Sequence, residues 1–216
     1  MKKTLFALAL SAHLFTPTAH AYDLQTCLNR INYGLGDVNY HLGSCYGMFL
    51  GEEKALGYYE KGSEIGEIIS MKTLARYYED RDPKRSFEQI KRCSEFGDEE
   101  CAEKLPYLYA YGRGTKKSYK KAVELLSKLA EKNPHHYSGL YQIAVEYKRP
   151  KEAVAFLQKG VKHDCGQCYT LLGIYYEYGG TVKRNIKKAV NLYDLGCISG
   201  YDVGCERATA ARYKYF

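Results

Sequence analysis

Eight cysteines are the residues whose type and spacing could do chemistry in this sequence. Cysteine thiols form disulfides, bind metal ions or exchange electrons with other thiols. An even count favours disulfides if the chain is exported. The sequence alone does not fix the connectivity, but four local pairs are the simplest solution: Cys27 with Cys45, Cys93 with Cys101, Cys165 with Cys168, and Cys197 with Cys205.

The segment His163-Asp164-Cys165-Gly166-Gln167-Cys168 allows three interpretations. A redox C-x-x-C motif belongs in a βαβ context, which this sequence lacks. A metal site built from His163, Cys165 and Cys168 needs a fourth ligand, and no other His or Cys is near in sequence. We favour a structural disulfide at a turn between helices, and we expect neither a metal site nor a cofactor.

Ser118 and Lys121 form the pattern S-x-x-K, the strongest catalytic candidate in the sequence. In penicillin-binding enzymes and serine β-lactamases this spacing places a lysine one helical turn from a nucleophilic serine. The S-D-N and K-T-G motifs of those enzymes are missing. Ser118 also aligns with Asn185, and Lys121 with Lys188, in an internal repeat. We therefore interpret Ser118 as a helix N-cap, with Ser118 and Lys121 as weak catalytic candidates.

The N-terminal residues 1–21 have the pattern of a secretory signal peptide. Lys2 and Lys3 precede a short apolar run, and Ala19-His20-Ala21 is a small-x-small cleavage signature. We expect cleavage after Ala21, which leaves a mature chain of residues 22–216 in the periplasm or released further. No later stretch approaches the length of ~20 apolar residues that a membrane span requires.

The formal net charge of +7 is mildly basic, and basic and acidic residues are interleaved. Lysine pairs such as Lys116-Lys117 are typical of solvated faces or loops. A nucleic-acid partner is therefore not expected.

An internal repeat organises the mature chain. Tyr109–Ala122 aligns without a gap with Tyr176–Ala189 at a shift of 67 residues, which corresponds to two units of 31 and 36. Apolar residues follow at three, four and seven positions, as on one face of a helix. One slot in every unit holds a small residue, at Ala55, Ser86, Ala122, Ala153 and Ala189.

Turn signals separate two helices in each unit. Glycines at 112, 114, 179 and 180 end first helices, Ser118 and Asn185 cap second helices, and Asn133-Pro134 is expected to start a helix. Such a unit cannot bury its apolar face alone, so units must stack. The sequence predicts an all-α fold, an α/α solenoid of about five helix-turn-helix repeats with capping helices at 22–33 and 201–216.

The last unit resembles the Sel1-like repeat, which is related to the tetratricopeptide repeat. The resemblance lies in Leu172-Gly173-x-x-Tyr176-x-x-Gly179, then Asn185, then Lys188-Ala189-x-x-Leu192-Tyr193. The segment from Cys197 to Cys205 is similar to the secreted cysteine-rich Sel1-like proteins of Helicobacter, in which cysteines eight apart join two helices.

That resemblance implies the disulfides Cys93–Cys101 and Cys197–Cys205. It does not extend to Cys165 and Cys168, because Val161 stands where the fourth unit should carry its first cysteine, nor to Cys27 and Cys45.

Tyrosine is the most unusual component, with 23 Tyr against no Trp. We expect about half of those on first helices to pack between helices and the rest to line a concave binding surface, with Tyr109, Tyr141 and Tyr176 as candidates. The leading hypothesis is a non-enzymatic module that binds a protein or peptide on its concave face. The alternative implied by the resemblance is a β-lactamase-like or penicillin-binding activity.

Overall fold

The computed structural model describes residues 23–31, 33–34 and 36–216, so the expected signal peptide at 1–21 lies outside the described residues. Within them the chain forms twelve α-helices and no strand. The helices are α1 Leu24–Asn29, α2 Val38–Leu50, α3 Glu52–Ile65, α4 Ile68–Tyr78, α5 Pro83–Glu95, α6 Glu99–Tyr111, α7 Tyr119–Lys132, α8 His136–Glu146, α9 Pro150–Val161, α10 Gly166–Tyr178, α11 Ile186–Ile198 and α12 Asp202–Tyr215.

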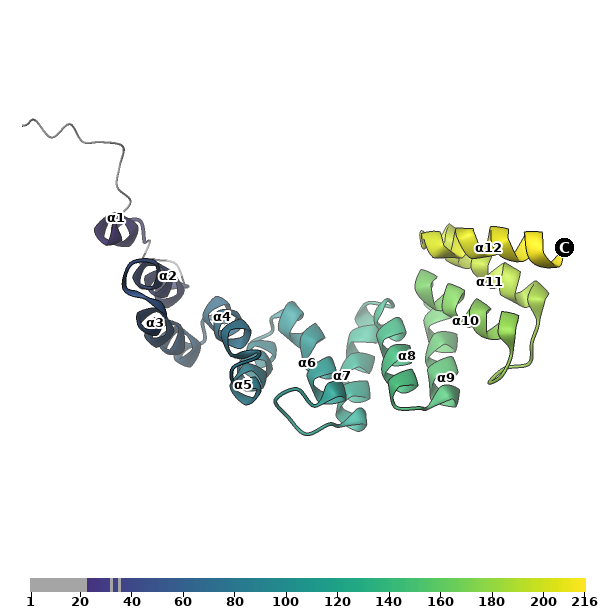
Figure 1. Ribbon diagram of the computed structural model, residues 1–216, viewed down its shortest axis with the longest axis horizontal. Coiled ribbons are helices and arrows are strands. Elements are labelled where there is room, and N and C mark those ends of the chain that lie inside the picture. Colours follow the sequence, from purple (N-terminus) through teal and green to yellow (C-terminus); the bar gives the residue numbers. More distant parts are fainter. Residues whose placement is uncertain (1–22, 32, 35) are drawn as a thin grey trace, which may run out of the picture.

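Helices α2 to α11 pack as five consecutive antiparallel pairs, with α1 before the first pair and α12 after the last. The pairs follow one another along an arc (Figure 1), with α2 and α4 on its inner side and α3 and α5 on its outer side. This confirms the predicted α/α solenoid with a single helix at each end. No helix in the described residues is long and apolar enough to cross a membrane.

The small-residue slot lies on the second helix of every pair. Ala55, Ser86, Ala122, Ala153 and Ala189 are all buried, on α3, α5, α7, α9 and α11 in turn. Small side chains there let the two helices of a pair approach closely. Ser86 is the polar exception, and its hydroxyl donates a 2.7 Å hydrogen bond to the Ala75 carbonyl of α4.

The predicted helix caps are confirmed at Ser118 and Asn185, whereas the third, at Asn133, lies before the helix that it was expected to start. The side chains of Ser118 and Asn185 accept hydrogen bonds from the backbone N–H of Lys121 and Lys188, at 3.3 and 2.9 Å. Asn133 is followed by a turn at residues 134–135, and its side chain accepts a 3.1 Å hydrogen bond from the His135 N–H. It ends α7, where its N–H bonds to the Leu129 carbonyl, and α8 begins only at His136. Asn133 therefore belongs to the C-terminal end of α7, although the sequence pattern assigned it to the start of α8.

The eight cysteines form four disulfides in the structure. Three join neighbouring helices: Cys27–Cys45 joins α1 to α2, Cys93–Cys101 joins α5 to α6, and Cys197–Cys205 joins α11 to α12. Cys165–Cys168 is different, because it closes only the first turn of α10.

Gly160 is the residue of α9 that faces Cys168. A Cβ added at Gly160 would lie 2.4 Å from the Cys168 sulfur. The alignment that put Val161 in this place was wrong by one residue. The reason is that the distance from the small slot to the cysteine differs between units: Cys93 follows Ser86 by seven residues, and Cys197 follows Ala189 by eight. The fourth unit follows the shorter spacing.

Candidate interaction surface

Tyrosines near the ends of three first helices contact a cation on the second helix of the same pair. The Arg85 guanidinium lies 5.1 Å from the centroid of the Tyr78 ring, and the Lys121 ammonium lies 4.9 Å from that of Tyr109. The Lys188 ammonium lies 4.2 Å from the centre of the Tyr176 ring and donates to its hydroxyl at 2.8 Å. Each cation directly precedes the small slot. These contacts hold a pair together by cation–π attraction.

The fourth pair, α8–α9, lacks both partners of this contact. Ala144 occupies the tyrosine position, four residues after the buried Leu140, and Glu152 occupies the position before the slot. The Glu152 carboxylate instead accepts a 2.7 Å hydrogen bond from the Tyr119 hydroxyl of α7 and pairs with Arg149. The tyrosine and its cation are thus replaced together, as expected if they act as one packing unit.

A second row of tyrosines lies between successive first helices. The rings of Tyr141 on α8 and Tyr175 on α10 meet edge to face, with centroids 6.2 Å apart. Tyr107 of α6 lies against Gly139 of α8, where an added Cβ would be 2.4 Å from its hydroxyl. Burial, together with the neighbouring Tyr175, raises the pKa of Tyr141 to about 12, so its hydroxyl stays neutral at physiological pH.

The three predicted binding tyrosines therefore fall into two environments. Tyr109 packs edge to face on Phe87 of α5 and lies beside Lys121, so it faces the second helices. Tyr176 likewise faces Lys188. Tyr141 lies in the row between first helices. Sequence periodicity did not separate these sets, because the ring direction depends on how neighbouring units stack.

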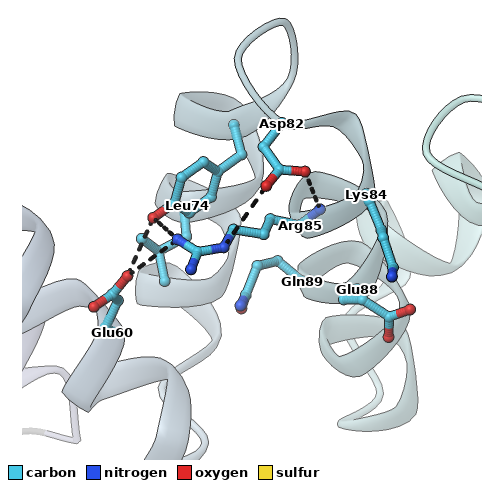
Figure 2. Close-up of a pocket in the computed structure, with 8 residues that line it drawn as sticks. Glu60, Leu74, Asp82, Lys84, Arg85, Glu88 and Gln89 are labelled. Carbon is cyan, nitrogen blue, oxygen red and sulfur yellow. Dashed lines mark hydrogen bonds and ion pairs between the residues drawn. The ribbon is translucent and has the colours of Figure 1, made fainter.

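Hollows open on both sides of the α4–α5 pair. On the second-helix side, a hollow of about 370 Å³ lies between α3, α4 and α5. Arg85 lines this hollow and makes polar contacts with other lining residues. The Arg85 guanidinium donates to the Tyr78 hydroxyl at 2.9 Å and lies between the carboxylates of Glu60 and Asp82 (Figure 2). These groups already satisfy one another, so little of their hydrogen-bonding capacity is free for a ligand.

Two further hollows adjoin α4 and differ in character from this one. One hollow of about 320 Å³ lies between α2, α4 and α6, and another of about 440 Å³ lies between α2, α3 and α4. Thr73 and Arg76 of α4 line both hollows. Arg76 is exposed, and its guanidinium makes no ion pair within the residues that the structure describes. It is therefore free to bind a carboxylate.

The repeat belongs to a known family of helix-pair repeats. A family model described as the Sel1 repeat matches residues 32–67, 100–134 and 166–201. The chain is a Sel1 repeat protein. The matched segments contain the pairs α2–α3, α6–α7 and α10–α11. The two pairs between them, α4–α5 and α8–α9, carry the same small slot but fall outside the matched segments.

Two solved structures of bacterial proteins have the same fold as this chain. A protective antigen of uropathogenic Escherichia coli with an SLR fold aligns with a TM-score of 0.57 at 21% identity, covering 84% of this chain. The chain spans 42% of that protein's length. A Sel1 repeat protein from Oxalobacter formigenes aligns with a TM-score of 0.55 at 20% identity, over 76% of this chain and 73% of its own. No curated protein matches the sequence. At these identities the likeness shows the fold alone.

The Sel1 repeat accounts for both residues of the S-x-x-K pattern. The Ser118 hydroxyl accepts from the Lys121 backbone N–H as an N-cap, and the Lys121 ammonium lies over the Tyr109 ring. Asn185 and Lys188 occupy the same positions in the last Sel1 repeat and make the same two contacts, the cap and the cation–π contact with Tyr176.

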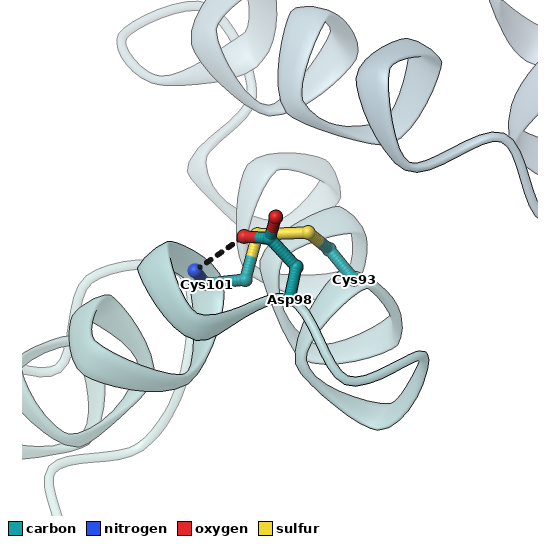
Figure 3. Close-up of side chains that lie close together, drawn as sticks. All are labelled: Cys93, Asp98 and Cys101. Carbon is teal, nitrogen blue, oxygen red and sulfur yellow. Dashed lines mark hydrogen bonds between the residues drawn. A yellow bond between two sulfur atoms is a disulfide. The ribbon is translucent and has the colours of Figure 1, made fainter. Parts of the chain in front are cut away.

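The cysteine clusters of this Sel1 repeat protein are disulfides with ordinary surroundings. Cys93, Asp98 and Cys101 lie together (Figure 3), but the two sulfurs are bonded to each other and the Asp98 carboxylate caps α6 by accepting from the Cys101 N–H at 2.9 Å. His163 stacks on Tyr137, with ring centroids 5.6 Å apart. The histidine is therefore engaged by an aromatic ring beside the Cys165–Cys168 bridge.

Two buried carboxylates were missed by the sequence reasoning. Glu67 accepts hydrogen bonds from the backbone N–H groups of Asn39 and Tyr40, at 2.9 and 3.1 Å, and so caps α2 from the turn before α4. Glu177 accepts from the hydroxyls of Tyr193 and Tyr215, at 2.6 and 3.2 Å. The partners of both glutamates lie 16 or more residues away along the chain, and no local pattern indicates such a partner.

Proposed function

We propose that the protein is an exported, non-enzymatic scaffold that binds a protein or peptide partner on the inner, first-helix side of its arc. Sel1 repeats are commonly protein–protein interaction scaffolds, and stacked repeats create extended surfaces suited to that task. Four disulfides support the export part of the proposal, because disulfides persist in oxidising compartments.

The observation that carries the proposal is Arg76. Its exposed guanidinium lines two adjoining hollows, of about 320 and 440 Å³, and has no ion-pair partner among the described residues. Arginine binds carboxylates through two parallel hydrogen bonds and is enriched among the residues that dominate binding energy. A partner that places a carboxylate on Arg76 and an apolar side chain in either hollow would use both features.

Site-specific photo-crosslinking tests this placement. A photoreactive amino acid replaces Thr73, which lines both inner hollows, or Glu88, which lines the outer one. The disulfide-intact protein is then irradiated in a periplasmic or culture extract. We expect a discrete protein adduct from position 73 that is lost with Arg76→Glu and kept with the matched reversal Lys91→Glu. Equal adducts from positions 73 and 88, or no discrete adduct from position 73, would contradict the proposal.

A further inference from the structure

The turns within the last three helix pairs carry a row of exposed lysines, which we call the basic edge. It consists of Lys116, Lys117 and Lys120 at the α6–α7 turn, Lys151 at the α8–α9 turn, and Lys183 and Lys187 at the α10–α11 turn. None of these ammonium groups forms an ion pair in the part of the chain that the structure describes, although fourteen ion pairs occur elsewhere in it.

Two of these lysines, Lys120 and Lys187, stand where local electrostatics disfavours them. The start of an α-helix carries partial positive charge and is stabilised by acidic residues. The first turns of α7 and α11 contain no acidic residue and instead hold Lys120 and Lys187. First turns elsewhere in the chain differ: α6 starts with Glu99 and Glu100 and α9 contains Glu152, while α8 and α10 hold no acidic residue. Helix stability therefore does not explain Lys120 and Lys187, whereas an anionic ligand would.

The repeat architecture brings the three turns onto one border of the molecule. Each first helix ends, and each second helix begins, at the same side of its pair. The α6–α7, α8–α9 and α10–α11 turns follow the lower and right-hand border of the arc (Figure 1). The lysines at these turns thus lie along one border of three successive units, where an extended anionic surface can meet more than one turn.

Exposed tyrosines accompany the lysines at the C-terminal end of this border. Tyr178, the last residue of α10, is 63% exposed, and Tyr213 near the end of α12 is 95% exposed. The Lys214 ammonium lies 5.9 Å from the centroid of the Tyr178 ring, which places the ends of α10 and α12 beside each other. Tyrosine beside lysine is the combination favoured at the headgroup level of a lipid bilayer.

We propose that the basic edge docks the protein onto the surface of an anionic phospholipid bilayer, with the Tyr178 and Tyr213 rings at headgroup level. The attraction comes from unpaired lysines near negatively charged headgroups, and the rings add interfacial contact. Docking in this way leaves Arg76 and the inner side of the arc free. The inference does not depend on a protein partner, and its assay contains none.

Vesicle sedimentation tests the proposal with the mature, disulfide-intact chain. The vesicles contain phosphatidylglycerol and phosphatidylcholine in equal parts, or phosphatidylcholine alone, in about 0.1 M salt. We expect binding to the mixed vesicles only. A lysine near an anionic membrane changes affinity by about fivefold. The combined variant Lys117→Gln, Lys120→Gln, Lys183→Gln and Lys187→Gln should therefore bind at least a hundredfold more weakly.

A matched control removes the same charge elsewhere. Lys91→Gln, Lys132→Gln, Lys159→Gln and Lys162→Gln lie away from the basic edge and should change binding less than a few-fold. Circular dichroism establishes that both variants are folded. The proposal is wrong if the control loses as much binding as the edge variant, or if the unaltered protein binds immobilised heparin but not the mixed vesicles, which would indicate a polyanionic chain as the ligand.

Tyr178→Ser with Tyr213→Ser should weaken vesicle binding at constant charge, and unchanged binding would contradict the placement of the rings.

Discussion

The hydroxyl of Tyr193 donates a 2.6 Å hydrogen bond to the buried carboxylate of Glu177 and so ties α11 to α10. Burial and the adjacent carboxylate raise the pKa of Tyr193, so the hydroxyl remains a donor. The same carboxylate accepts from Tyr215 and lies 3.8 Å from the Lys214 ammonium, both on α12. Glu177 of α10 therefore links α11 and α12 through polar contacts with its carboxylate.

Removing the Tyr193 hydroxyl should destabilise the fold. Hydrogen bonds to charged groups contribute about 1.5–3 kcal/mol, and Tyr193→Phe removes a donor from a buried carboxylate. We expect a loss of that size in the free energy of unfolding, measured by urea denaturation with the disulfides intact. Tyr213→Phe, at a fully exposed ring, is the matched control and should change stability by less than about 0.5 kcal/mol. Equal effects of the two substitutions would rule out this role for Glu177.

The pKa of Glu67 makes part of the stability pH-dependent. Burial opposes ionisation, but hydrogen bonds from Asn39, Ser70 and Tyr40 outweigh it and lower the pKa of Glu67 below its usual value of 4.5. The unfolded state then binds more protons than the folded state in acid, so stability is present above about pH 4.5 and is lost as the pH falls through the folded-state pKa.

Glu67→Gln measures this contribution. We expect the variant to be about 2 kcal/mol less stable than the unaltered protein at pH 7, because an ionised cap of α2 is lost. The gap should narrow as the pH falls below 4.5. Denaturant titrations at pH 7 and pH 3.5 give the difference directly, with the exposed Glu88→Gln as control. A gap that stays constant with pH would mean that Glu67 is not ionised in the folded protein.

The two kinds of disulfide should differ in what they contribute to stability. Cys93–Cys101 joins two helices across eight residues, whereas Cys165–Cys168 spans three residues at the start of α10. Loop-closure entropy predicts about 2.5 kcal/mol for the first bridge and about 1.6 kcal/mol for the second. Paired Cys→Ser variants compared by thermal unfolding should show this order. Peptide mapping without reduction checks the pairing itself, and a cross-linked peptide that joins different cysteines would overturn it.

Ser118→Ala should lower the stability of α7 without changing any reaction with penicillin. Loss of an N-cap is worth about 1 kcal/mol, and Asn185→Ala removes the equivalent cap of α11 at a similar cost. Incubation with a labelled penicillin, followed by mass spectrometry of the intact chain, should give no adduct on Ser118. A covalent adduct that disappears in Ser118→Ala would instead support the penicillin-binding alternative.

Two glycine-to-alanine substitutions should have opposite effects. Gly160 has no room for a Cβ, which would lie 2.4 Å from the Cys168 sulfur, so Gly160→Ala should destabilise by about 1–3 kcal/mol. Gly57 lies in α3 with nothing within 4 Å of an added Cβ, so Gly57→Ala should stabilise by up to about 1 kcal/mol. Melting temperatures compare the two, and a stabilising Gly160→Ala would show that α9 and α10 do not pack as described.

The sequence by itself determined the repeating unit. A small residue recurring at alternating distances of 31 and 36, with apolar residues at helical spacing, predicts stacked helix pairs, because one unit cannot bury its face alone. The cap at Ser118 was equally accessible, since a cap is a contact between residues three apart. The start of α8 could not be predicted from the sequence, because Asn133 suits both the end of one helix and the beginning of the next.

Only the tertiary structure decided which way side chains point between units. Tyr109 and Tyr141 look alike in sequence, yet one packs on Phe87 beside a lysine and the other meets Tyr175 across two first helices. The partners of Glu67 and Glu177, the exposed Arg76 and the shared border of the basic edge depend in the same way on the stacking of units. Local periodicity specifies which face of a helix is buried, but contacts between residues far apart along the chain are set by the rotation of one unit relative to the next.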